Sequence, residues 1–176
     1  KVSWSLEEFD LHGNRQPEGS FLVSSDTIGL AALQEIATQT RISMIGGNPE
    51  VDSHPLSAPR IALYKSWSAS MDAGWIRLLL ETYGFSYHLL TDAEVRAGNL
   101  HERFDAIILP DQGAGQIRNG RQKGTIHPNY VGGITQGGVD HLVEFVEEGG
   151  TLISNKNSND LLIGAFRLPL RNALSG

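Results

Sequence analysis

The sequence contains no cysteine. Disulfide bonds, thiolate metal ligands and cysteine nucleophiles are therefore excluded within these 176 residues. Positive charge is also scarce, because 14 Lys and Arg stand against 20 Asp and Glu, for a formal net charge of −6. Such a surface is poorly suited to neutralising phosphates, so we expect no nucleic-acid partner. No run approaches the ~20 apolar residues that cross a bilayer, so we expect no membrane span.

Strands and helices alternate from Arg60 onward. Apolar runs predict strands at 60–64, 86–90, 104–109 and 151–154. Helices are predicted at 72–83, from Thr91 towards His101 after a Thr91–Glu94 capping box, and around 139–146, whereas eight glycines in 111–138 predict a long loop. This order predicts a doubly wound α/β domain around a mostly parallel sheet. The first helix has an apolar stripe of Met71, Trp75, Leu78, Leu79 and Tyr83.

The first 59 residues predict a smaller unit. Apolar segments at 21–23, 28–37 and 42–46 predict a strand, a helix and a strand, a small βαβ appendage. Residues 47–59 contain three prolines and predict an extended linker, whereas residues 1–20 predict an edge strand or a tail. We therefore expect two domains, 1–59 and 60–176. Because the chain begins at Lys1 and stops at Gly176, we also expect a fragment of a longer protein, with the second domain truncated at its C-terminus.

Polar residues follow three of the predicted strands, where open parallel sheets bind ligands. A pocket for a small molecule or anion is one interpretation, and ordinary loop polarity is the other. The candidate ligand-binding residues are Ser66 and Trp67 after the first strand, Asp111 and Gln112 after the third, and Asn155 and Lys156 after the fourth, with Ser68, Gly113, Asn157 and Ser158 beside them.

Motifs for metal or phosphate chemistry are incomplete. His141 and Glu144 have the His-x-x-Glu spacing of some zinc sites, but no histidine follows to complete the site, so we expect solvated side chains and no metal. The glycines from Gly115 to Gly120 have phosphate-loop spacing, yet Arg121 stands where lysine is required. No helix is expected to open there, and no Gly-x-Ser-x-Gly elbow occurs. We expect no catalytic residue in the chain.

A series of motifs in the second domain resembles a known family. The motifs are APRIALYKSW (58–67), MDAGW (71–75), LTDA (90–93), RAGNL (96–100), FDAIILPDQ (104–112), YVGGI (130–134), VEEGGTL (146–152) and LPLRN (168–172). Over about residues 58–174 the chain is similar to a domain that follows the peptidase domain in large secreted bacterial zinc carboxypeptidases. That domain resembles class I glutamine amidotransferases, which implies a flavodoxin-like fold.

The resemblance also implies that this segment is not an enzyme. Amidotransferases of this class carry a cysteine on the turn after the strand that matches 151–154, with a histidine further along the chain. Here the turn reads Asn155-Lys156-Asn157, and no histidine follows. Neither amide nor amine replaces the thiolate as acyl acceptor in that mechanism.

We therefore expect a non-catalytic accessory domain of a zinc metallocarboxypeptidase that removes C-terminal residues from peptides. Its partner would be the upstream peptidase domain, and that domain would hold the zinc. The protein would be secreted or periplasmic. The alternatives are a module that binds a small polar ligand, a homo-oligomerisation module like similar domains in some glycosidases, and a degenerate amidotransferase that uses Ser158.

Overall fold

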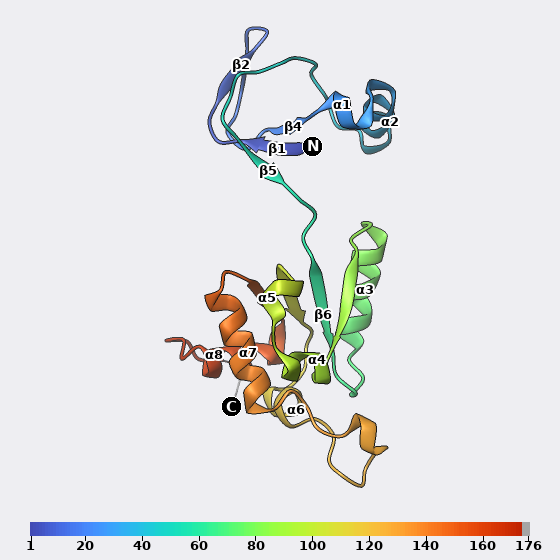
Figure 1. Cartoon of the computed structure of the whole chain (residues 1–176), viewed down its shortest axis with the longest axis vertical. Coiled ribbons are helices and arrows are strands. Elements are labelled where there is room, and N and C mark those ends of the chain that lie inside the picture. Colours follow the sequence, from blue (N-terminus) through green and yellow to red (C-terminus); the bar gives the residue numbers. More distant parts are fainter. Residues whose placement is uncertain (174–176) are drawn as a thin grey trace. The chain divides into compact units, whose positions relative to one another are not determined.

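The computed structural model describes residues 1–173, so the last three residues of the second predicted domain lie outside the described part. The chain divides into two compact units, Lys1–Ala58 and Pro59–Gly176 (Figure 1). The predicted boundary between residues 59 and 60 falls one residue from this division.

The first unit is built on an antiparallel sheet. Strand β1 (Val2–Ser5) pairs with β4 (Phe21–Val23) on one side and with β5 (Ser53–Leu56) on the other. Strands β2 (Phe9–Leu11) and β3 (Asn14–Gln16) form a hairpin, and helices α1 (Ser25–Ile28) and α2 (Leu30–Thr40) follow β4.

The predicted βαβ appendage is wrong. Residues 42–46 form no strand, because α2 ends at Thr40, its C-cap Arg41 lies in the left-handed region (φ 57°), and the following apolar run finds no partner strand. The partners of β4 come instead from the predicted tail and the predicted linker. Pro55 fits in β5 because β5 is an edge strand, where a missing N–H costs no ladder bond.

The second unit is an α/β domain with a four-stranded parallel sheet, as the alternation predicts. Its strands β6 (Ile61–Lys65), β7 (Tyr87–Thr91), β8 (Ala106–Leu109) and β9 (Thr151–Ser154) lie in the order β7-β6-β8-β9. Its helices are α3 (Met71–Thr82), α4 (Asp92–Ala97), α5 (Leu100–Arg103), α6 (Ala114–Asn119), α7 (Thr135–Glu147) and α8 (Asn159–Ala165), with 3-10 turns at Pro128–Tyr130 and Lys156–Ser158.

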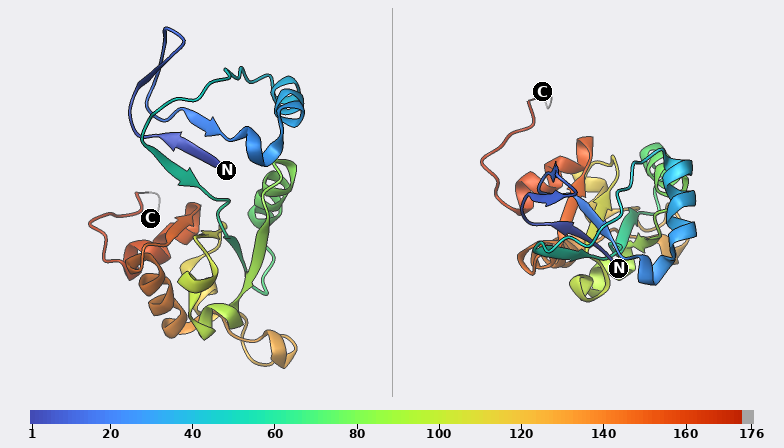
Figure 2. Two further views of the ribbon diagram at one scale, coloured as in Figure 1. Left: turned by 45° about the horizontal axis from the view of Figure 1, so that its top comes forward. Right: turned by 90° about the horizontal axis from the view of Figure 1, so that it is seen from above.

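The core of this unit lies on one face of the sheet. Alternate strand residues, among them Tyr64, Leu90 and Ile107, pack with Val95 of α4 and Leu142 of α7, and all five are almost fully buried. Helix α3 lies across the sheet from these helices (Figures 1 and 2). The two faces of the sheet are therefore covered unequally.

The apolar stripe of α3 does not face the sheet. Trp75, Leu78, Leu79 and Tyr83 are 60%, 51%, 56% and 74% exposed, and Met71 is 79% exposed. The half-buried positions are Asp72, Ala73, Ile76 and Leu80. Both sets have helical spacing, so periodicity identifies the helix correctly but not the side that the sheet contacts.

Two predicted boundaries also differ. The segment 111–138 contains α6 and a 3-10 turn, because Ile117 is fully buried and holds a turn of helix in a glycine-rich stretch. Glycine is required there, since a Cβ on Gly120 (φ 60°) would lie 1.9 Å from the Gly132 carbonyl oxygen. The helix predicted from Thr91 towards His101 is split into α4 and α5, because Gly98 and Asn99 have positive φ.

The predicted capping box at the start of α4 is confirmed. The Glu94 N–H donates to Thr91 Oγ1 over 3.4 Å, and the Thr91 N–H donates to Glu94 Oε2 over 2.9 Å. Burial raises the pKa of Glu94, but hydrogen bonds from Thr91, Arg103 and His88 outweigh it and lower the pKa to about 2. The folded state therefore favours the charged form of this carboxylate.

We expect Glu94 to make folding sensitive to acid. Its lowered pKa contributes stability above the ordinary value near 4.5, and this contribution is lost as the pH falls towards 2. Glu94→Gln should reduce the free energy of unfolding at pH 7 by about 1 kcal/mol, because the cap is weakened. Urea titrations between pH 7 and 3 test this, and the variant should lose less stability on acidification than the wild type. Parallel losses in the two proteins would contradict it.

Candidate functional site

The candidate residues after β6 and β8 form a buried polar knot. Gln112 Nε2 donates to Ser66 Oγ over 2.6 Å, and the Ser68 N–H donates to the same oxygen over 3.1 Å. Ser66, Ser68 and Gln112 are 8%, 7% and 5% exposed. Burial of polar groups is tolerated because they bond to each other, so this knot fixes the loop after β6 against the loop after β8.

Trp67, on the same loop, packs against an aromatic side chain of the glycine-rich segment. Its indole ring lies 4.2 Å from the ring of Tyr130, between centroids, so the glycine-rich segment reaches back to this edge of the sheet. Trp67 remains 42% exposed. It is thus placed where a ligand can reach it.

A second cluster contains Asp111 and Lys156. Lys156 Nζ donates to Asp72 Oδ2 over 2.8 Å and lies 3.7 Å from Asp111 Oδ2. Asp111 Oδ1 accepts from the backbone N–H and the side-chain amide of Asn157, over 3.1 and 2.8 Å. Hydrogen bonding to Asp72 and the charge of both carboxylates raise the pKa of the Lys156 amine. The amine is therefore an ammonium ion at neutral pH.

The backbone at Lys156 is unusual. Lys156 has φ 50°, in the left-handed region, between β9 and the helical turn that leads into α8. A strained residue on a sharp strand-to-helix turn is the backbone arrangement of a nucleophile elbow. Here the residue with the left-handed backbone is Lys156, whose side chain is paired with Asp72.

Asn155 and Ser158 close this turn. Ser158 Oγ accepts from the Asn155 N–H over 2.9 Å, and it lies within hydrogen-bonding distance of the carbonyl oxygens of Asn155 (2.7 Å) and Leu109 (3.2 Å). Ser158 is fully buried. Its hydroxyl has no access to a substrate, so the arrangement does not support it as a nucleophile.

The six candidate residues therefore fall into two neighbouring groups. Ser66, Trp67 and Gln112 line a cavity of about 320 Å³, whereas Asp111, Asn155 and Lys156 form the elbow cluster beside it. The two groups are linked through Ser70, whose hydroxyl lines the cavity and donates to the Asp111 carbonyl oxygen over 3.2 Å.

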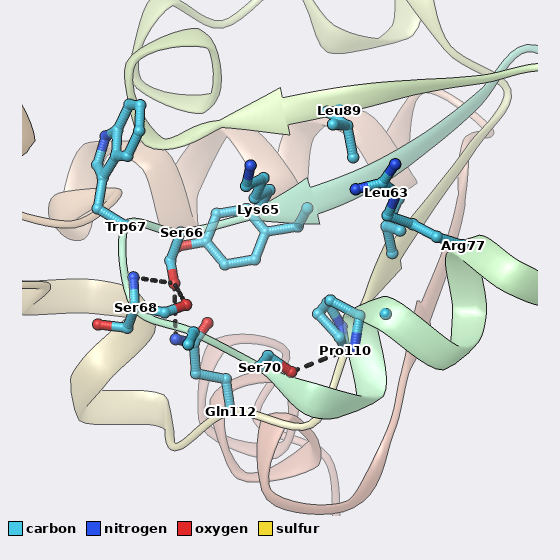
Figure 3. A pocket seen from close by; sticks show the side chains of 14 residues that line it. Leu63, Lys65, Ser66, Trp67, Ser68, Ser70, Arg77, Leu89, Pro110 and Gln112 are labelled. Atoms are coloured by element: carbon cyan, nitrogen blue, oxygen red, sulfur yellow. Dashed lines mark hydrogen bonds between the residues drawn. The ribbon is translucent and has the colours of Figure 1, made fainter.

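The cavity lies between α3 and the carboxyl ends of β6 and β8. Figure 3 shows Ser66, Ser68 and Gln112 gathered in one part of it and Arg77 beside Leu63 and Leu89 in another, with Lys65 between these groups. Sequence analysis missed Lys65, Ser70 and Arg77. Arg77 belongs to no motif, and its role appears only because residues 73, 74 and 77 of α3 line the cavity.

Tyr64 and Asp92 form a buried hydrogen-bonded pair next to the Trp67 backbone. Tyr64 Oη donates to Asp92 Oδ1 over 2.6 Å, and the two residues are 0% and 2% exposed. Burial raises the pKa of Asp92 and that of Tyr64, which favours the uncharged forms. The sequence shows Asp92 only as an acidic residue in the first turn of a helix, so nothing in it signals this pair.

His141 is not a solvated side chain. It is half-buried, and its Nδ1 lies 3.0 Å from the Val95 carbonyl oxygen, so it connects α7 to α4. Among residues 1–173 no group of three or more His, Cys, Asp or Glu is placed to hold a metal ion. Within the same residues, no helix has the length and apolar character that crossing a membrane requires.

Comparisons of the chain with models of protein families, with curated proteins and with solved structures find no match.

We expect Ser158→Ala to act on stability. The change leaves the buried Asn155 N–H with a poorer partner and removes a donor from two carbonyl oxygens, which costs about 1–3 kcal/mol. Thermal and urea unfolding measure this loss. Ser154→Ala is the comparison variant, because Ser154 lies nearby on β9 and its hydroxyl donates to Asn159 Oδ1 in an exposed contact, whose loss should cost less. Equal stability of wild type and Ser158→Ala would contradict the structural role.

Proposed function

We propose that the second unit is a non-catalytic accessory domain of a secreted zinc metallocarboxypeptidase. The observation that carries the proposal is the elbow after β9, which keeps a left-handed backbone at Lys156 but holds an ammonium ion between two carboxylates. A protonated amine has no free electron pair with which to attack a carbonyl carbon. The turn thus has the form of a catalytic elbow without its chemistry.

The strand order supports an amidotransferase-like fold. Taken in chain order from β6, the strands lie as 2-1-3-4, which is the beginning of the flavodoxin-like order. In the class I amidotransferases that the sequence resembles, the thiol follows the strand equivalent to β9. We propose that this chain keeps that fold, that the zinc and the catalytic residues belong to an upstream peptidase domain, and that the protein acts outside the cytoplasm.

The exposed stripe of α3 supports the accessory role. Four large apolar side chains of α3 and that of Tyr83, its C-cap, are more than half exposed, which is unfavourable in water unless a partner covers them. We propose that the peptidase domain of the same protein is that partner. Homo-oligomerisation through this helix is the alternative.

The cavity favours a second candidate function, the binding of a small polar ligand. Its volume of about 320 Å³ is in the range of ligand-binding pockets, and serine, glutamine and cationic side chains line it together with apolar ones. An accessory domain could bind such a ligand without transforming it.

A glutaminase assay on the purified chain tests the proposed absence of catalytic activity. We expect no release of ammonia from glutamine by the wild type, because the amine at the elbow is charged and Ser158 is buried. Lys156→Met and Ser158→Ala should be indistinguishable from it. Turnover by the wild type that either substitution abolishes would refute the proposal.

The role of α3 is tested by hydroxyl-radical footprinting. In a longer protein that contains the peptidase domain, Met71, Trp75 and Tyr83 should be oxidised several-fold more slowly than in this chain, because the partner covers them. Tyr130 serves as the control, since it lies on another element and is 38% exposed. Equal oxidation in both proteins at low concentration would show that the peptidase domain does not cover α3.

A further inference from the structure

We propose that the cavity beside α3 binds a carboxylate that is attached to a small apolar group. The proposal deepens the second candidate function given above and rests on it, and it concerns the identity of the ligand. It follows from the charge of the cavity wall, from the donors that this wall offers and from the shape of the space between α3 and β6.

The wall of the cavity is cationic in an acidic protein. Lys65 and Arg77 contribute to the lining, and none of the described residues that line it is Asp or Glu. In the whole chain, by contrast, acidic residues outnumber basic ones by 20 to 14. The cavity therefore has the opposite sign of charge from the protein as a whole, which favours an anionic ligand.

Lys65 has no ion-pair partner among the described residues. It ends β6 and is exposed. Asp72 and Asp111 do not line the cavity, and their carboxylates are paired with Lys156. The Lys65 ammonium is thus available to a ligand.

Arg77 is held in a fixed orientation. Its Nε donates to Tyr87 Oη over 2.9 Å, and Tyr87 Oη donates to Glu81 Oε1 over 2.6 Å. The direct contact from Arg77 Nη2 to Glu81 is long, at 3.5 Å. These contacts use two of the five N–H donors of the guanidinium. The remaining donors can form the charge-assisted hydrogen bonds that a carboxylate accepts.

The rest of the wall selects for an apolar group beside the charge. Leu63, Leu89, Ala73 and Pro110 line the cavity, and Ser66 is already bonded within the polar knot. A Cβ built on Gly74 would have no neighbouring atom within 4 Å, so α3 leaves open space at this point. A phosphate offers no apolar surface to these side chains, whereas a carboxylate with a short aliphatic side chain matches both parts of the wall.

Isothermal titration calorimetry tests the proposal with N-acetyl-leucine, its neutral amide, and a tripeptide that ends in a free leucine carboxylate. We expect both carboxylates to bind and the amide to bind at least tenfold more weakly. Tighter binding of the tripeptide would identify a chain end as the ligand, and equal binding would identify a free small molecule. Equal binding of acid and amide, or no binding of either carboxylate, would overturn the proposal.

Variants locate the site. Lys65→Met and Arg77→Met should each weaken binding of N-acetyl-leucine at least tenfold, whereas Lys123→Met, which removes the same charge from an exposed loop position, should leave it unchanged. Gly74→Leu should fill the open space and weaken binding without loss of folding, because leucine is a better helix former than glycine. Unchanged binding in all three cavity variants would overturn the assignment. The glutaminase assay tests the absence of catalysis, whereas the binding measurements test the ligand of the cavity. Either proposal can therefore fail without the other.

Discussion

An ammonium ion lies between two carboxylates at the carboxyl edge of the parallel sheet. Lys156 stands at the bend after β9, Asp72 in the first turn of α3, and Asp111 after β8. One side chain therefore joins three connections that are distant in sequence. The Asn157 amide and Ser70 hydroxyl add hydrogen bonds to Asp111. The bend after β9 is therefore occupied by a cation that is paired with both neighbouring connections.

The same arrangement leaves α3 in an unusual place. Its first turn is tied to the elbow through Ser70 and Asp72, while its later turns cover the sheet only at Ile76 and Leu80. A cavity remains on the side of Gly74 and Arg77, and the large apolar side chains point away from the sheet. The helix thus has two exposed features of different chemistry, a cationic cavity and an apolar surface. The proposed accessory role assigns the apolar surface to docking and the cavity to ligand binding.

The sequence predicts the second unit well because local signals suffice there. Buried strands read as continuous apolar runs, and the Thr91–Glu94 capping box marks the start of α4 within a few residues. The first unit is predicted poorly, since its sheet joins β1 to β5 across about fifty residues, and no local pattern encodes that pairing. The orientation of α3 is missed for a related reason, because two of its faces carry helical spacing.

The candidate site was predictable in its location but not in its contacts. The carboxyl ends of parallel strands meet at one edge of a sheet, so the positions of Ser66, Asp111 and Lys156 alone predict a site there. The partner of Lys156 is Asp72, 84 residues away, and only the folded chain brings them together. Arg77 and Lys65 carry no motif, and their importance arises from the cavity that they line.

The protonation state of Lys156 tests the central claim most directly. A pH titration of its side-chain amine by NMR, with Lys123 as an exposed reference, measures the pKa of both. The account predicts a pKa for Lys156 above the ordinary lysine value of 10.5, with the ammonium form present throughout the neutral range. A Lys156 amine that loses its proton near neutral pH would be a competent nucleophile, and it would contradict the interpretation of this turn as inert.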